Sequence, residues 1–61
     1  MAKFIELYDP VYETRVLVNF DLVETIEQTS ENGAHSLLHF SRETRSVRES
    51  MDEIKAMLAL P

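Results

Sequence analysis

The stretch TIEQTSENGAHSLLHF, residues 25–40, decides the fold of this chain because it places two strand patterns around one turn. Threonine and isoleucine, which favour strands, are frequent in its first part. In its last part Ser36, Leu38 and Phe40 occupy alternate positions, so they share one face of a strand. The Asn-Gly pair at 32–33 is a strong turn signal, and the stretch therefore predicts a β-hairpin.

The length of this turn fixes which residues face each other across the hairpin. A two-residue loop would place Ile26 opposite His39, which lies on the other face of its strand. A three-residue loop at 31–33 places Ile26 opposite Leu38 and gives Gly33 the left-handed position that this loop type requires. We therefore expect Ile26 to pair with Leu38.

Toward the N-terminus, residues 3–8 and 14–20 read as two further strands, rich in aromatic and β-branched side chains. The Asp-Pro pair at 9–10 ends the first one, because proline cannot donate to a ladder. A tight turn is expected at 19–22 and the hairpin's first strand at 23–29. A helix is a competing interpretation there, since the apolar positions 22, 23 and 26 also have helical spacing. The strand is preferred because turn residues follow so closely.

Toward the C-terminus the chain turns again at 41–44 before a fifth short strand. A two-residue loop would need positive φ at two non-glycine residues, so a four-residue loop built on a type I turn is expected. Either loop would place Leu38 opposite Val47 and Phe40 opposite Arg45. Arg45 would then lie over the Phe40 ring, a contact worth about 0.5–1 kcal/mol on an exposed surface.

The start of the C-terminal helix is the clearest local signal in the chain. Ser50 and Glu53 fit a capping box, which predicts a helix over about residues 51–59 before the closing Pro61. Its apolar side chains form one stripe at helical spacing. This stripe is expected to pack on the chain's own sheet, and it is also the candidate protein interface: Met51, Ile54, Met57 and Leu58.

Together these patterns predict a fold that is mainly β with one C-terminal α-helix, as a single small domain over residues 1–61. The expected architecture is a meander of about five short antiparallel strands plus the helix, either small and barrel-like or an open sheet. The chain has no cysteine, so neither disulfides nor thiolate zinc sites can stabilise so small a core. One short helix cannot cover both faces of the sheet, so a homo-oligomer is expected.

Charge is uneven along the chain, whose net charge is −5. Residues 1–32 contain seven acids and two bases, whereas residues 33–61 are balanced. An acidic half suits a basic protein partner and disfavours nucleic acid, whose binding depends on clustered lysine and arginine. No apolar run approaches the ~20 residues needed to span a bilayer, and the N-terminus lacks a signal-peptide pattern. The expectation is a soluble, cytoplasmic protein without membrane insertion.

No constellation of residues predicts catalysis, a cofactor or a metal. His35 and His39 are four residues apart, but on a strand their backbones would lie about 13–14 Å apart, too far for one metal ion. None of the serines lies in a nucleophile-elbow motif, and a chain with one glycine has no phosphate-binding loop. We therefore expect the protein not to be an enzyme.

The remaining candidates for a binding site are basic. Arg42, Arg45 and Arg48 are spaced by three, so on a strand they would scatter over both faces. Together with His35 and His39 they are the candidate ligands for a small anionic molecule held between subunits.

The segment VLVNFDLVETIE at 16–27, followed by VRES at 47–50, resembles the small flagellar and swarming-motility proteins called FlbD and SwrD. Other short bacterial and phage proteins look similar. The resemblance covers about residues 16–54 and implies a short apolar strand, a hairpin, and a Val-Lys-Glu-Ser segment that opens a C-terminal helix. Here Arg48 stands in place of that lysine, and Ser-Arg-Glu-Thr at 41–44 stands where the family commonly has Asn-Gly. The resemblance implies no catalytic residues.

Three functions are thus open on the sequence. The first is a non-enzymatic interaction protein, self-associating and similar to the motility accessory proteins. The second is a phage-borne oligomer that binds or sequesters a small ligand between its subunits. The third, least favoured by the acidic charge, is a nucleic-acid-binding module.

Overall fold

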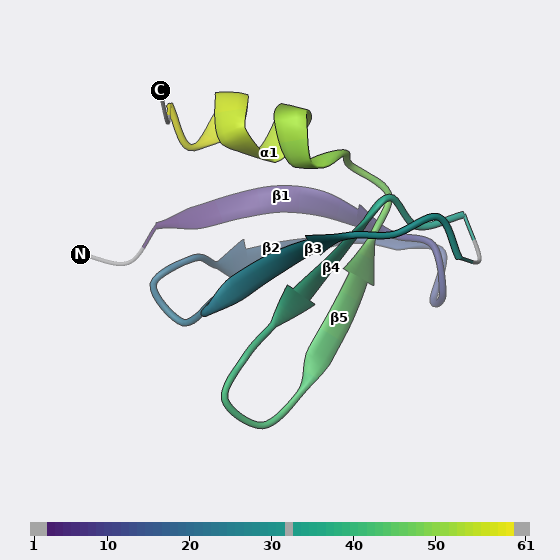
Figure 1. Ribbon diagram of the computed structural model, residues 1–61, viewed down its shortest axis with the longest axis horizontal. Helices are drawn as coiled ribbons and strands as arrows, with labels where there is room; N and C mark the ends of the chain where they lie inside the picture. Colours follow the sequence, from purple (N-terminus) through teal and green to yellow (C-terminus); the bar gives the residue numbers. More distant parts are fainter. Residues whose placement is uncertain (1–2, 32, 60–61) are drawn as a thin grey trace.

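The computed structural model of the chain describes residues 3–31 and 33–59, and over these residues it is mostly β with one C-terminal helix (Figure 1). The strands form two open antiparallel sheets, one of two strands and one of three, and no closed barrel. The predicted fold class is therefore confirmed, in its open form. The elements are β1 (Phe4–Asp9), β2 (Thr14–Asn19), β3 (Thr25–Gln28), β4 (Ser36–His39), β5 (Thr44–Val47) and α1 (Met51–Met57).

The first hairpin pairs β1 with β2 along their whole length, from Phe4 opposite Asn19 to Asp9 opposite Thr14. The loop at 10–13 begins at proline, as expected, and contains Glu13 in the left-handed region with φ of 54°. After β2 the N–H of Leu22 donates to the Asn19 carbonyl at 3.1 Å, which confirms the tight turn. Among the described residues β2 pairs only with β1, so the single five-stranded meander implied by the sequence is divided here into two sheets.

The second sheet contains the hairpin that the sequence specified best. β3 and β4 pair antiparallel with Ile26 opposite Leu38, which confirms the predicted register and excludes the helical alternative for this segment. Gly33 has φ of 76°, as the turn requires, and the N–H of Ala34 donates to the Glu31 carbonyl at 2.9 Å. Asn32 lies outside the described residues.

The predicted register of the next hairpin is wrong by two residues. Ser36 pairs with Val47 and Leu38 with Arg45, whereas the sequence predicted Leu38 opposite Val47 and Phe40 opposite Arg45. The N–H of Phe40 donates to the carbonyl of Glu43 at 2.8 Å, so only residues 41–42 form the tip, and neither has positive φ. Four residues, 40–43, separate β4 from β5, so the expected loop length is confirmed. The loop begins one residue earlier than the predicted 41–44, and this displaces the register by two. A shift of two keeps every side chain on its expected face.

The helix begins as predicted and ends slightly earlier. The Ser50 side chain accepts from the N–H of Glu53, and the Glu53 carboxylate accepts from the N–H of Ser50, so the capping box is present. α1 ends at Met57, and Ala59 has φ of 57°, which turns the chain out of the helix. The predicted helical end at residue 59 is therefore wrong by two positions, and Pro61 lies outside the described residues.

The core lies where the inner faces of the two sheets meet α1, which runs beside β1 and contacts β3 (Figure 1). Alternate residues of the strands point into it, as their two-residue periodicity predicts. Both sheets and the helix contribute buried apolar side chains to this core, and Ile54 is the one from the helix. The members of the buried cluster are Ile5, Leu7, Val18, Leu38, Val47 and Ile54. The β4–β5 hairpin extends away from the helix at the opposite side of the molecule.

Candidate interaction site

A buried carboxylate joins the two sheets. Asp9 is 2% exposed and shares the inner face of β1 with Ile5 and Leu7. One oxygen, Oδ1, accepts from the N–H groups of Val11 at 2.8 Å and Tyr12 at 3.2 Å, so it holds the first turn. The other oxygen, Oδ2, faces the second sheet.

Arg45 of β5 forms an ion pair with Oδ2 of Asp9. Its Nη1 donates to Asp9 Oδ2 at 2.7 Å, because Arg45 lies on the inner face of the second sheet at the edge of the core. The expected stacking of Arg45 on Phe40 is therefore replaced by an ion pair between sheets. The sequence offered no signal for this pair, since its members are 36 positions apart.

A second connection lies at the junction of β1, β5 and the helix. The carbonyl of Tyr8 accepts from the N–H of Arg48 at 2.8 Å, and the N–H of Tyr8 donates to the carboxylate of Glu49 at 3.0 Å. The carbonyl of Glu49 also accepts from the hydroxyl of buried Ser36 at 2.8 Å. The Arg48 guanidinium lies 4.1 Å from the centre of the Tyr8 ring. This cation–π contact joins the first sheet to the segment before the helix, and no local pattern in the sequence predicts it.

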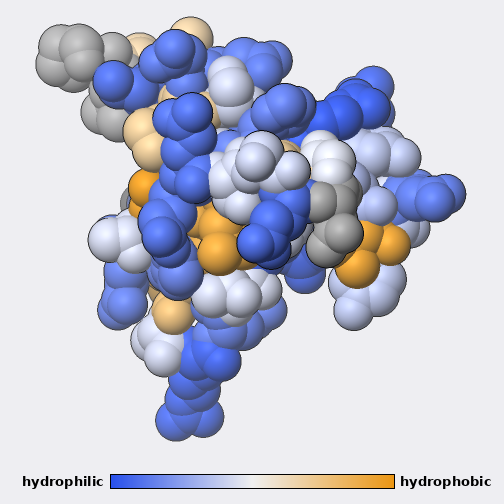
Figure 2. Space-filling model, turned by 45° about the vertical axis from the view of Figure 1, so that its right-hand side comes forward, coloured by the Kyte–Doolittle hydropathy of each residue, from blue (hydrophilic) through white to orange (hydrophobic). Residues whose placement is uncertain are grey.

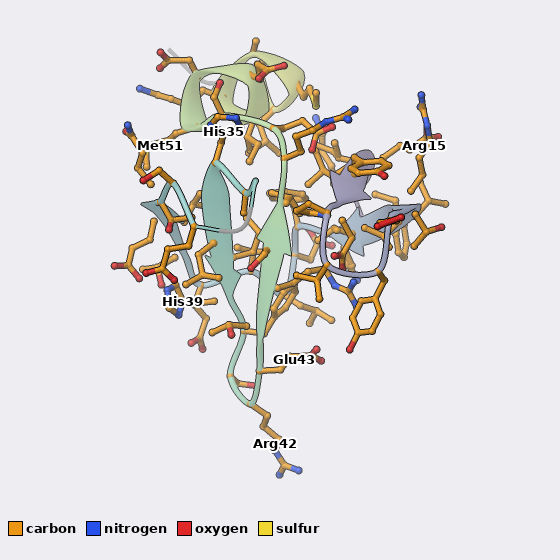
Figure 3. The ribbon with its side chains drawn as sticks, turned by 90° about the vertical axis from the view of Figure 1, so that its right-hand side faces the viewer. Arg15, His35, His39, Arg42, Glu43 and Met51 are labelled. Atoms are coloured by element: carbon orange, nitrogen blue, oxygen red, sulfur yellow. The ribbon has the colours of Figure 1, made fainter. Side chains whose placement is uncertain are left out.

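The two histidines lie in different surroundings. His39 Nε2 is hydrogen-bonded to Glu27 across the β3–β4 pair, whereas His35 lies exposed near the start of the helix (Figure 3). No group of three or more histidine, cysteine, aspartate or glutamate side chains in a metal-binding arrangement is found among residues 3–31 and 33–59.

The structure does not gather the five basic candidates into one site on a single chain. Arg42 projects from the tip of the β4–β5 hairpin, at the opposite end of the molecule from His35 (Figure 3). Arg45 is held by Asp9, Arg48 covers Tyr8, and His39 is bound to Glu27. Arg45, Arg48 and His39 thus contact different residues, and they do not form a common binding site within one chain.

The apolar stripe of the helix, which the sequence suggested as an interface, contains both buried and exposed side chains. Ile54 is fully buried in the core, and Met51 and Leu58 are partly buried. Met57 is 41% exposed, so it points away from the core. A shallow, mainly apolar groove runs between the helix and β3, and Lys55 and Glu24 stand at its margin.

The largest exposed apolar side chains near any strand edge lie around β2. Leu17 is 67% exposed, Phe4 57% and Leu22 62%. They border a groove of about 430 Å³ whose other wall is the β4–β5 hairpin, with Phe40, Glu43 and Arg45. Elsewhere, as Figure 2 shows for one face, hydrophobic side chains reach the surface in separate areas among hydrophilic ones.

The backbone of β2 also presents an open edge beside this groove. The N–H of Phe20 donates to the Lys3 carbonyl at 2.8 Å, and in an antiparallel pair every second residue is hydrogen-bonded to the partner strand. Val16 and Val18 therefore face β1, while Arg15, Leu17 and Asn19 direct their backbone groups away from it. Within the described part of the chain, the N–H and C=O of Leu17 have no hydrogen-bond partner.

The charges near this edge are paired or few. Arg15 donates to the carboxylate of Glu6 on the outer face of the first sheet, and this hydrogen bond raises the pKa of the guanidinium.

A second pKa shift lies at the start of the helix, where the hydrogen bonds with the backbone and hydroxyl of Ser50 lower the pKa of Glu53. Neither Arg15 nor Glu53 points to a catalytic acid or base, because both side chains are exposed and each shift has a structural cause.

Over residues 3–31 and 33–59 no helix combines the length and the apolar composition needed to cross a bilayer. The chain was compared with models of protein families, with curated proteins and with solved structures, and none of them matched.

Proposed function

We propose that this chain is a non-enzymatic interaction protein that associates with itself, in the manner of a small accessory protein. The observation that carries the proposal is the exposed apolar cluster of Phe4, Leu17 and Leu22 beside the open edge of β2. Large apolar side chains rarely gather at an unpaired strand edge in a monomer, since such an edge promotes association with other chains.

The small core gives a second reason for association. A chain of 61 residues has a core that supplies roughly 3–5 kcal/mol, and small domains often complete their burial through a partner subunit. The polar groups near the core are used to join the sheets, as Asp9 and Glu49 illustrate. We therefore favour the apolar edge of β2 over the groove between the helix and β3, because its large apolar side chains are the more exposed.

Light scattering coupled to gel filtration, over micromolar to millimolar concentrations, tests the proposal. A mass that rises from one chain to a defined small multiple is expected. A mass of one chain at every concentration would overturn the self-association.

The motility role suggested by the VRES and VLVNFDLVETIE segments is part of the same proposal. Genes for flagellar motor components beside the gene for this chain would support it. Neighbouring prophage genes would instead favour a phage-borne ligand-binding oligomer.

A further inference from the structure

The open edge of β2 is complementary to itself. We infer that β2 pairs antiparallel with β2 of a second copy, across a two-fold axis at Leu17, to form a continuous sheet in the order β1-β2-β2-β1. This inference rests on the proposed self-association and names its surface, partner and register.

The backbone pattern selects this register. Arg15, Leu17 and Asn19 are the residues of β2 that direct N–H and C=O away from β1. With Leu17 opposite Leu17 of the second copy, Arg15 lies opposite Asn19 at both ends, so all three outward residues gain a partner. The Asn19 carbonyl, which already accepts from the N–H of Leu22, would accept a second hydrogen bond there. A shift of two residues in either direction leaves one of them without a partner inside the strand. The centred register also gives each Leu17 N–H the Leu17 C=O of the other copy.

The side chains agree with the same register. On the outer face, Leu17 of each copy would meet at the axis. Its direct neighbour in β1 is Glu6, and Phe4, which pairs with Asn19, lies diagonal to it. On the inner face, Val16 would lie opposite Val18 of the second copy. Cross-strand pairs of this kind contribute about 0.2–1 kcal/mol each. The exposed Leu17 and Phe4 of the outer face would therefore be covered, whereas Val18 of the inner face is already buried in the core.

Charge favours a second copy at this edge over the open edge of β3. The chain carries a net charge of −5, but the only charged residue in Thr14–Asn19 is Arg15, which the centred register keeps away from Arg15 of the second copy. β3, whose outward residues are Ile26 and Gln28, carries Glu27 and follows Glu24. β5, the other edge strand of the second sheet, also lacks acids, but none of its side chains is a large exposed apolar one. Acidic chains would thus meet along a strand that has no acid and exposes Leu17.

The small size of the first sheet also favours the addition of strands at the edge of β2. An isolated two-stranded sheet is marginal in water, so β1 and β2 depend on the shared core, and a four-stranded sheet would add to that support. Thr14–Asn19 contains neither the proline nor the lysine that commonly protects an edge. A two-fold pairing uses both edges and closes, so it yields dimers and leaves no β2 edge for further growth.

Amide hydrogen exchange of the unaltered protein tests the pairing without any substitution. We expect exchange of the Leu17 N–H to slow at least about tenfold between dilute and concentrated samples, because only the dimer gives it an acceptor. The N–H of Ile26, on the open edge of β3, is the internal control and should exchange at the same rate in both. Equal Leu17 rates in samples that light scattering shows to be monomeric and dimeric would overturn the inference.

A pair of variants gives the second arm of the experiment. Leu17→Lys places two ammonium groups at the axis and should weaken the dimer at least about tenfold. Val11→Lys adds the same charge at a side chain that is 58% exposed in the first turn, and it should leave the dimer intact. A dimer that persists in Leu17→Lys would overturn the inference and leave the proposed function standing. A wild-type chain that is monomeric at all concentrations would overturn both.

Discussion

Asp9 is a buried acid whose two oxygens are both occupied. Oδ1 accepts from two backbone N–H groups of the first turn, and Oδ2 accepts from Arg45 of the second sheet. The residue therefore fixes a local turn and a distant contact at once. A buried charge is tolerated here because it is both paired and hydrogen-bonded.

Asp9→Asn should lower the free energy of unfolding by about 2 kcal/mol, because the amide keeps an acceptor for the turn but loses the charge that holds Arg45. In a domain whose core supplies roughly 3–5 kcal/mol, this change is a large part of the total. Urea denaturation followed by circular dichroism measures it. Asp21→Asn, which removes an exposed acid from the next turn, is the control and should change the midpoint little. Equal shifts for the two variants would refute the role given to Asp9.

Gly33 is a residue whose role the sequence predicted and the backbone confirms. Its φ of 76° costs a residue with a Cβ about 1–2 kcal/mol, although space is available, since an added Cβ would lie 3.9 Å from Pro10 Cβ. Gly33→Ala should therefore destabilise the chain by about 1 kcal/mol. Gly33→Asn should cost less, because asparagine adopts the left-handed region more readily. Thermal unfolding of both variants separates backbone strain from crowding, and an equal loss in the two would exclude backbone strain as the cause.

At the scale of elements, the sequence predicted what depends on neighbours along the chain. The β3–β4 register followed from a glycine at one position, and the helix start followed from Ser50 and Glu53. The β4–β5 register did not follow from local sequence. Ser36 pairs with Val47, and in this register the hydroxyl of Ser36 donates to the carbonyl of Glu49. That contact belongs to the packing of three elements, and no local pattern encodes it.

The candidate site likewise depends partly on local sequence and partly on how the elements pack. Alternation identified the inner face of β2, but the exposure of Leu17 depends on β2 having no second neighbour in its sheet. The sequence suggested one five-stranded meander, in which β2 would be covered by β3. The break between the sheets is what creates the open edge, and no pattern along the chain marks it, because β2 and β3 are joined by a short turn as in a continuous meander.

The helix start should respond to pH through Glu53. The hydrogen bonds with Ser50 lower the folded-state pKa of Glu53 from its usual 4.5, so the fold favours the ionised carboxylate. The stability that Glu53 contributes is thus fully present above its unfolded pKa and is lost as the pH falls through the lower folded pKa. Glu53→Gln can keep the capping box but cannot titrate.

Urea midpoints of wild type and Glu53→Gln, measured from neutral to acidic pH, check this dependence. The wild type should lose more stability on acidification than the variant. Ser50→Ala removes one of the two interactions that lower the pKa, so it should reduce the acid sensitivity of the wild type. Identical pH profiles for wild type and Glu53→Gln would contradict the capping role.

At the scale of the whole molecule, two sheets that share no continuous ladder are held as one body by a few polar contacts around an apolar core. Glu49 contributes twice, because its carboxylate accepts from Tyr8 of the first sheet and its carbonyl accepts from Ser36 of the second. Both tyrosines, Tyr8 and Tyr12, belong to the first hairpin, and the chain has no tryptophan. Tyrosine fluorescence therefore reports the first hairpin, while far-ultraviolet circular dichroism reports the secondary structure of the whole chain, the helix included.

Glu49→Ala should destabilise the chain by about 1–3 kcal/mol, because it leaves the partly buried N–H of Tyr8 without an acceptor. Glu49→Gln, which keeps one acceptor oxygen, should cost less. If the sheets form one cooperative unit, the fluorescence and dichroism transitions will coincide in urea for the wild type and will move together in both variants. A first hairpin that loses its fluorescence signal in Glu49→Ala while the helix remains would show instead that the sheets fold separately. The same fluorescence signal distinguishes this fold defect from loss of the β2 pairing, because Leu17 lies on the side of the hairpin that Glu49 does not contact.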